Sequence, residues 1–378
     1  MESLAPPRVS SRPDAPPRSV AIMLMSAIGD VVKGFPVATS LKSAWPDVRI
    51  TWVIQPVSVP LVRPHPHVDE LLVFERRKGL RGIAPFLEFR RRISGRSFDL
   101  VLGLQVYAKA GILTALLPSP RKLGFDRRRA RDLNWLFTTE RIPARPTQHL
   151  QDQYFEFLEH LEVPVVRQWH IPFDRAEREA QRTFFAGFDR PVLAVVLGAT
   201  SPKRNWHAQG YARALEAAQY DLGLQPVLVG SRSPGELDMA ARVKEATRAT
   251  PVDALRTDLR RLAWILDGSR VVLSPDTGPL HIADALGRPV VGLYGYTDPR
   301  VKGPYRGGTR LVVDRFTRPG EPLTMDLRPG NVAKITPDEV IEKLALAVRE
   351  GPVVSSSSPY ASGGGATDPV SGSGAEGT

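Results

Sequence analysis

The sequence predicts an α/β protein of the GT-B type, with two Rossmann-like, doubly wound domains that face a central cleft. Short apolar runs alternate with helix-length segments, and this alternation starts twice, at Val20 and at Pro191. Apolar runs without alternating polar positions are typical of parallel strands covered by helices on both faces. The 378 residues also suffice for two cores of ordinary size.

Each run opens with a strand that leads into a helix. The first run has a strand at Val20–Met25, a turn at Gly29 and a helix over Asp30–Ser43. Its further strands are expected at Arg49–Ile54, Leu71–Phe74 and Asp99–Leu104. The second run has strands at Pro191–Leu197, Pro226–Val229, Arg270–Leu273 and Pro289–Leu293, the last of which closes the set. Its helices are expected at His207–Gln219, Glu236–Ala246, Asp258–Leu266, Pro279–Leu286 and Pro337–Arg349, the last capped by Thr336.

Composition sets the domain boundaries. Residues 1–18 are expected to be a disordered leader without the apolar stretch of a secretory signal. An N-terminal acceptor-binding domain should span 19–175, and a C-terminal nucleotide-sugar-binding domain 188–350, joined by a polar, Arg/Glu-rich segment. Residues 351–378 are Ser/Gly-rich and expected to be disordered.

The residue types exclude several chemistries. The chain has no cysteine, which rules out disulfides, Cys-ligated zinc and thiol catalysis, and a reducing cytoplasm is its simplest location. No apolar run reaches the ~18 residues of a membrane-spanning helix. His65 and His67 lack further ligands for a metal. There is no P-loop, and no Gly-x-Gly-x-x-Gly follows either opening strand.

Positive charge is concentrated in the first part of the chain. Residues 1–150 hold 24 Lys and Arg against 12 Asp and Glu, whereas the remainder holds 27 against 28. Such a surface favours anionic partners such as acidic sugars, phosphorylated lipid headgroups, an anionic membrane or nucleic acid. A solvated basic face is the alternative. Nothing in the spacing of aromatic or zinc-binding residues supports nucleic acid.

Three segments at strand ends could carry chemistry. Ser274–His281 places a Gly turn and Pro279 at a helix start, so the N–H groups of Thr277 and Gly278 could bind a diphosphate, with His281 one turn further on. A capped helix without a ligand is the alternative. Gly198–Trp206 offers hydroxyls and two cations that could neutralise a departing diphosphate, or be a basic solvent loop.

The third segment is Ser26–Val32, in which Asp30 begins a helix. An acid is favoured there for capping alone. As a function, Asp30 could be a general base that accepts the proton of an acceptor hydroxyl.

Together these segments resemble glycosyltransferase family 9, the ADP-heptose:lipopolysaccharide heptosyltransferase family. The opening signature extends from Ser26 to Val32 and on to Phe35-Pro36 and Trp45-Pro46-Asp47. The most specific motif is Ser274–His281, and the block after it contains Tyr294–Pro299. The resemblance covers roughly Val20 to Val348.

The resemblance implies an inverting, metal-independent sugar transferase without a cofactor, with Asp30 as catalytic base. It implies that the donor is held by Thr200, Ser201, Glu236, Thr257, Leu259, Asp276, Thr277, Gly278 and His281. The family usually has a phosphate-binding Lys where this chain has Arg204. Arg204 is therefore expected in that catalytic role by register, with Lys203 as its rival.

The expected partners follow from the same resemblance. They are ADP-heptose as donor, a Kdo- or heptose-bearing lipid A core as anionic acceptor, and a peripheral contact with the cytoplasmic membrane face. Nucleic acid is not expected. The rival hypotheses are a related transferase with another nucleotide sugar or acceptor, and a non-catalytic nucleotide-sugar or nucleic-acid binding module.

Overall fold

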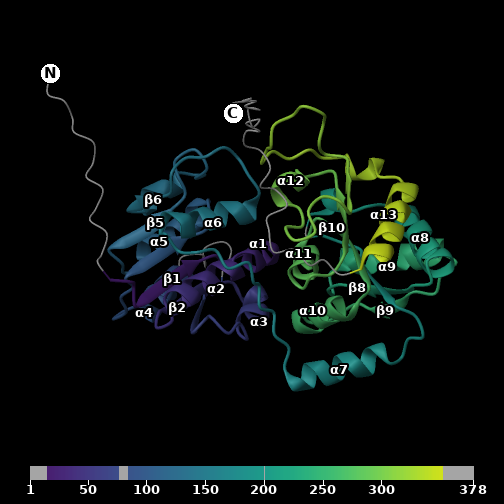
Figure 1. Ribbon diagram of the computed structural model, residues 1–378, viewed down its shortest axis with the longest axis horizontal. Coiled ribbons are helices and arrows are strands. Elements are labelled where there is room, and N and C mark those ends of the chain that lie inside the picture. Colours follow the sequence, from purple (N-terminus) through teal and green to yellow (C-terminus); the bar gives the residue numbers. More distant parts are fainter. Residues whose placement is uncertain (1–14, 76–83, 200, 352–378) are drawn as a thin grey trace, which may run out of the picture.

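Two parallel six-stranded sheets lie side by side in the structure, a computed structural model that describes residues 15–75, 84–199 and 201–351 (Figure 1). The strand order of the first sheet is β3-β2-β1-β4-β5-β6, and that of the second is β9-β8-β7-β10-β11-β12. The order therefore reverses direction after β1 in one sheet and after β7 in the other, as in doubly wound folds. The predicted GT-B architecture is confirmed.

The predicted strands are present, and four further strands complete the sheets. The strands are β1 (Ser19–Met23), β2 (Arg49–Ile54), β3 (Glu70–Val73), β4 (Leu100–Gly103), β5 (Arg121–Gly124), β6 (Glu140–Arg141), β7 (Val192–Val196), β8 (Gln225–Val229), β9 (Val252–Ala254), β10 (Val271–Pro275), β11 (Val290–Tyr294) and β12 (Val312–Asp314). Because β12 pairs with β11, the expectation that the strand at Pro289–Leu293 closes the second set is wrong. The four extra strands have only two to four residues each, too few for a hydrophobic pattern to mark them.

The helices are α1 (Ile28–Lys33), α2 (Phe35–Ala44), α3 (Val59–Val62), α4 (Ala84–Arg92), α5 (Ala108–Leu116), α6 (Leu150–His160), α7 (Arg175–Phe185), α8 (Ala208–Glu216), α9 (Pro234–Ala246), α10 (Leu259–Gly268), α11 (Gly278–Ala285), α12 (Pro299–Lys302) and α13 (Pro337–Glu350). The single helix expected over Asp30–Ser43 is divided at Gly34. Pro36 has no amide hydrogen with which to continue the ladder, so α2 begins anew. Thr336 caps α13 as predicted, in a capping box with Glu339.

Alternate residues of each central strand face opposite helical layers. In the first sheet, one face packs against α1, α2 and α6, and the other against α4 and α5. In the second, one face packs against α8, α9 and α13, and the other against α10 and α11. One cluster of buried apolar side chains runs from α1, α2 and α6 into α10 and α11, so the two domains share a core where they meet.

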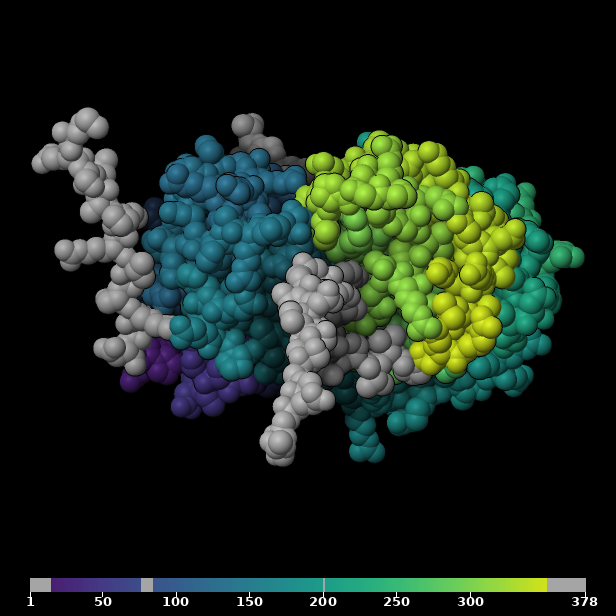
Figure 2. Space-filling model, turned by 45° about the horizontal axis from the view of Figure 1, so that its top comes forward, coloured from purple at the N-terminus to yellow at the C-terminus, as the bar shows by residue number. Residues whose placement is uncertain are grey.

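The polar segment expected to join the domains forms α7. Asp174 caps it, and its Glu177 carboxylate accepts hydrogen bonds from Arg260 of α10. Figure 2 shows the two lobes side by side, the blue one from the first part of the chain and the green and yellow one from the second. Residues 1–14 of the expected leader and 352–378 of the expected tail lie outside the described residues. Among the described helices, none has the length and apolar character needed to cross a bilayer.

Candidate active site

Two helix starts meet across the domain boundary. They belong to α1, which follows β1 of the first sheet, and to α11, which follows β10 of the second. A Cβ on Gly29 would lie 2.3 Å from Cδ2 of His281, and one on Gly278 would lie 3.0 Å from Cβ of Ile28. The distance at Gly29 is too short for any Cβ unless His281 moves, so the close contact of the two helix starts depends on glycine there. At Gly278 a Cβ would fit only if Ile28 shifted by a few tenths of an ångström.

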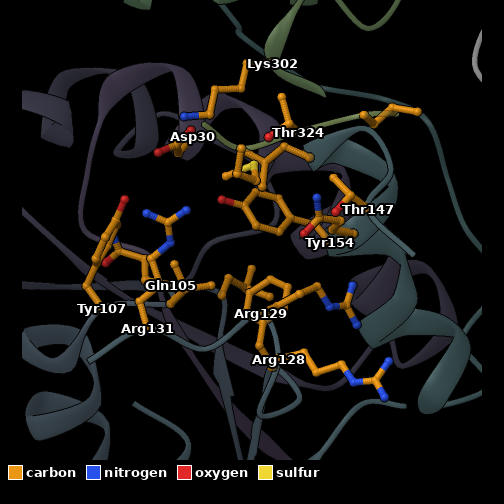
Figure 3. A pocket seen from close by; sticks show the side chains of 17 residues that line it. Asp30, Gln105, Tyr107, Arg128, Arg129, Arg131, Thr147, Tyr154, Lys302 and Thr324 are labelled. Atoms are coloured by element: carbon orange, nitrogen blue, oxygen red, sulfur yellow. The ribbon is translucent and has the colours of Figure 1, made fainter. Parts of the chain in front are cut away.

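Asp30 lies half-buried at the start of α1 and faces a cavity of about 290 Å³. Its Oδ2 accepts a hydrogen bond of 3.3 Å from the Ala27 amide, so it also caps the helix, as the alternative interpretation expected. The cavity is lined mainly by the N-terminal domain, with three arginines on one side and residues 323–325 of the other domain closing it (Figure 3). The carboxylate is therefore placed where an acceptor hydroxyl can reach it.

Several polar residues of this cavity were not predicted from the sequence. Lys302, at the end of α12, points its ammonium toward Asp30 from the opposite domain (Figure 3). Gln105 follows β4, and its amide bonds Met25 N and Ser26 O, which fixes the turn that leads to Asp30. Tyr154 of α6 is buried against the same cavity. Lys302 stands just after the motif at Tyr294–Pro299, which was the only available signal for it.

A second cavity, of about 620 Å³, lies at the carboxyl edge of the C-terminal sheet. Four of the residues expected to hold the donor line it, namely Glu236, Thr257, Leu259 and Thr277. Ile28 and Val57 of the N-terminal domain also line it. α1 thus borders both cavities, with Ile28 facing this one and Asp30 facing the other.

The carboxylate of Glu236 is held rigidly at the floor of the second cavity. Its Oε2 accepts hydrogen bonds from Ser231 N at 2.9 Å and from Ser233 Oγ at 3.1 Å. The side chain packs over two glycines at strand ends, because a Cβ on Gly198 would lie 2.6 Å from its Cγ and one on Gly230 3.1 Å from its Oε1. A fixed carboxylate next to bare backbone can accept hydrogen bonds from a pair of sugar hydroxyls.

Asp276 anchors the start of α11 from beneath. Its Oδ2 accepts a 2.6 Å hydrogen bond from Thr297 and lies 3.2 Å from Arg204, whose guanidinium also bonds the Asp276 carbonyl at 3.0 Å. Burial alone would raise the pKa of Asp276, but His281, Arg204 and Thr297 together hold it well below its usual range. Arg204 therefore lies at the helix start where a diphosphate would bind, whereas Lys203 is exposed to solvent.

His281 is buried between the domains and contacts Lys33 of α1. The Lys33 Nζ lies 3.0 Å from Nδ1 of His281. Burial, reinforced by the Lys33 charge, lowers the pKa of His281, so the ring is neutral at pH 7. A Lys ammonium can only donate, which leaves the ring hydrogen on Nε2, the nitrogen that lies 3.8 Å from Asp276 Oδ1. Lys33 was not predicted. Its signal was a single charge within the apolar run Val31–Pro36.

The remaining predicted residues lie as follows. Thr200 is outside the described residues, and Ser201 is half-buried at the start of the loop that carries Arg204. The side chains of Asp276 and His281 face each other, His281 also contacts Lys33 of α1, and neither residue lines the second cavity. The described residues contain no group of three or more His, Cys, Asp or Glu side chains arranged to hold a metal ion.

The chain matches known proteins in family and in fold. The model of glycosyltransferase family 9 (heptosyltransferase) matches residues 86–317. The lipopolysaccharide core heptosyltransferase OpsX of Haemophilus influenzae is 28% identical over 298 residues, which cover 78% of this chain and 84% of that protein.

Two solved structures share the fold. The crystal structure of a family 9 glycosyl transferase from Veillonella parvula has a TM-score of 0.75 and 24% identity, covering 88% of this chain and 98% of that one. E. coli heptosyltransferase WaaC with ADP has a TM-score of 0.63 and 24% identity, covering 87% and 99%. The chain belongs to glycosyltransferase family 9, the heptosyltransferases, and is a glycosyltransferase, as the sequence predicted.

Proposed function

We propose that this glycosyltransferase moves a heptose from ADP-heptose to the inner core of lipopolysaccharide, with inversion at the anomeric carbon. The observation that carries the proposal is the position of Asp30, which faces a cavity rich in arginine on a helix that also borders the second cavity. The relative named above is a lipopolysaccharide core heptosyltransferase, and a solved relative contains ADP.

In the proposed reaction, an acceptor hydroxyl in the first cavity attacks the anomeric carbon of the donor. A new C–O bond forms on the face opposite the diphosphate, the hydroxyl proton passes to Asp30, and the bond to the diphosphate oxygen breaks with its electron pair. Asp30 lies in the first turn of α1, where its Oδ2 accepts a hydrogen bond from the Ala27 amide. It accepts the proton as the attacking oxygen becomes acidic.

The C-terminal domain would stabilise the leaving diphosphate. The amides of Thr277 and Gly278 begin α11, where the helix dipole favours negative charge. Arg204, held by Asp276, adds a fixed cation at the same helix start. Glu236 would accept hydrogen bonds from the ribose hydroxyls, with Thr257 and Leu259 beside the base. A preorganised set of this kind gives transition-state stabilisation without a metal.

The N-terminal domain would bind a Kdo- or heptose-bearing lipid A core. Arg128, Arg129 and Arg131 line the cavity that holds Asp30. Arg129 already forms ion pairs with Asp126 and Glu156. Arg128 and Arg131 have no ion pair with any described residue. These two are suited to the carboxylates and phosphates of such an acceptor. We place the reaction at the cytoplasmic face of the inner membrane, where a lipid-linked acceptor is held.

The test is transfer by the purified enzyme from a panel of ADP-, UDP- and GDP-sugars to deacylated Kdo-lipid A saccharide, followed by mass spectrometry. ADP-heptose should be the best donor. Asp30→Asn should reduce turnover by about 10³-fold or more while donor affinity stays within a few-fold, because only the proton acceptor is lost. Asp47→Asn, an exposed acid of the same domain, is the control.

Either of two results would contradict this proposal. A faster reaction with another nucleotide sugar would point to a family member with a different donor. Unchanged turnover in Asp30→Asn would remove Asp30 from the mechanism.

A further inference from the structure

An exposed apolar surface lies on the N-terminal domain next to the acceptor cavity. Tyr107, Ile112, Leu133 and Leu136 are exposed to 51%, 38%, 60% and 57%. Only nine large hydrophobic side chains are exposed in the described part of the chain, and four of them fall within residues 107–136. We call these four side chains the apolar patch. Such clustering marks an interaction surface, whereas single exposed apolar residues need no explanation.

The patch belongs to two elements that are fixed to each other. It lies on α5 and on the 3₁₀ turn η3 (Asn134–Phe137). The buried Asn134 amide donates a 2.8 Å hydrogen bond to the Tyr107 carbonyl. A Cβ on Gly111 would lie 2.4 Å from the Phe137 ring, so the contact between α5 and η3 requires glycine there. The patch is therefore a preformed surface.

Leu133 is held outward by an unusual backbone. Its φ is +58° and that of Asp132 is +51°, in the left-handed region that a leucine rarely adopts. Asn or Gly would fit this conformation with less strain. Because Leu133 is 60% exposed and its backbone is strained, its side chain contributes little to the stability of the fold. Backbone strain of this kind accompanies functional positions.

Positive charge is concentrated in the segment that carries the patch. Residues 105–139 contain seven basic and two acidic residues. Lys109, Arg127, Arg128 and Arg131 form no ion pair with any residue that the structure describes, and Arg127 stacks on the half-buried ring of Trp135 at 4.2 Å. Exposed aliphatic and aromatic side chains in the same segment as cations without ion pairs match the interface of an anionic bilayer, which takes apolar groups at its acyl boundary and cations at its headgroups.

The patch is continuous with the acceptor site. Tyr107 belongs to the patch and also lines the Asp30 cavity. The cations Arg128 and Arg131 line the same cavity. Figure 3 shows Tyr107 and Arg131 at one side of this cavity, below Asp30. If the patch binds a bilayer, the Asp30 cavity lies at the headgroup region, where the sugar of a lipid-anchored acceptor is held.

We propose that the apolar patch, with Lys109 and Arg127 beside it, docks the enzyme on an anionic phospholipid bilayer and delivers the membrane-held acceptor to Asp30. This inference rests on the proposed function, since it takes the acceptor to be a lipid. It adds the surface that meets the membrane and the headgroup charge that this surface selects.

The test compares sedimentation of the full-length enzyme with two kinds of vesicle, phosphatidylcholine alone and phosphatidylcholine mixed with phosphatidylglycerol. The wild type should bind the anionic vesicles and bind phosphatidylcholine weakly. The double variant Leu133→Asn, Leu136→Ser should lose about tenfold or more in binding, because both side chains leave the acyl boundary. Asn suits the backbone at 133, so misfolding does not explain such a loss. Lys109→Gln and Arg127→Gln should each reduce binding about fivefold.

Tyr220→Ser is the matched control, since Tyr220 is as exposed as Leu136 but lies in the π-helical turn after α8, in the other domain. It should sediment like the wild type. Activity gives a second measurement. The patch variants should lose transfer to Kdo-lipid A embedded in anionic vesicles and keep wild-type transfer to the deacylated, soluble saccharide.

Several outcomes would overturn the docking proposal. They are equal binding of the wild type to both vesicles, wild-type sedimentation by the double variant, and no vesicle binding by a wild type that instead forms dimers through the patch. Failure of the proposed function is a separate result. It would appear as no transfer to the soluble saccharide by a wild type that still binds anionic vesicles.

Discussion

The two domains have the same strand order, but the cavities at the carboxyl edges of their sheets are lined by different kinds of side chain. In both, the carboxyl ends of the strands border a cavity at the point where strand order reverses. The N-terminal cavity is lined by arginines, Tyr107 and Tyr154 around Asp30. The C-terminal cavity is lined by glycines, small hydroxyl side chains and apolar residues around Glu236. The topology sets where a ligand lies, and the loop residues set which ligand it is.

The two domains are joined by a contact between helices that border these cavities. Helix α1 of one domain and helix α11 of the other meet at Gly29 and Gly278, and each carries a polar residue into the contact, Lys33 from α1 and His281 from α11. A buried cation facing a neutral imidazole is an expensive contact for stability alone. It places the helix of the proposed base against the helix of the proposed diphosphate site.

Among the variants that separate the roles of the two domains, we expect the largest effect from removing the charge of Arg204. Arg204→Gln should reduce turnover by about 10²–10³-fold, because the leaving diphosphate loses a fixed charge at the α11 start. Lys203→Gln is the control and should stay within a few-fold of wild type in the same steady-state assay, since Lys203 is exposed. A larger loss from the Lys203 variant would assign the phosphate contact to Lys203.

The next effect concerns the contact between the domains. Burial lowers the pKa of Lys33 to about 8 from its ordinary value of 10.5. Between these values the unfolded chain binds more protons than the folded one, so the free energy of unfolding should rise with pH, by roughly 3 kcal/mol in all. Below pH 8 the full cost of the buried charge is present. Lys33→Met should lack this rise.

Urea unfolding of both proteins at pH 7 and at pH 10 measures the difference. Lys203→Met, at an exposed position, should follow the wild type. If wild type and Lys33→Met changed equally with pH, Lys33 would not be the group responsible.

A smaller effect should separate donor from acceptor binding. Glu236→Gln should raise the KM for the donor about 10- to 100-fold, because an amide replaces an ionised acceptor of ribose hydroxyl hydrogen bonds. The KM for the acceptor should not change. Asp238→Asn, on the same helix with a side chain 70% exposed, is the control. A rise in both KM values would indicate damage to the fold of the domain.

The smallest effect is expected on the acceptor side. Arg131→Gln should raise the KM for the soluble saccharide acceptor about tenfold and leave the KM for the donor unchanged, since one charged hydrogen bond is lost. Arg127→Gln, whose side chain stacks on Trp135 outside the cavity, should leave both values near wild type. The reverse order of the two arginines would move the acceptor site onto the outer surface.

Much of the architecture could be predicted because short stretches of sequence show it in their pattern of apolar residues. The central strands are buried on both faces and therefore read as unbroken apolar runs, as at Val192–Val196. The strands β6, β9 and β12 could not be found, since two or three residues form a strand only when a neighbouring strand is already in place. The break at Gly34 was likewise missed, although Pro36 was visible in the sequence.

The site was predictable in part for the same reason. Asp30 and Thr277 follow strand ends within recognisable turns, whereas Glu236 was expected only from the family resemblance, and the structure places all three at cavities. Lys33 and Lys302 were missed because their importance comes from the opposite domain, which lies more than 200 residues away for the pair Lys33 and His281. No local pattern records such a contact.

The sequence by itself determined two doubly wound repeats, an acid at the first helix start and a Gly-Pro turn that opens a later helix, because hydrophobic period and turn chemistry act between near neighbours. Only the tertiary structure decided that Asp276 and His281 face each other and not the second cavity, that Arg204 rather than Lys203 lies at the α11 start, and that the apolar patch adjoins the Asp30 cavity. These depend on how the domains and loops pack, which is set by the fit of distant side chains.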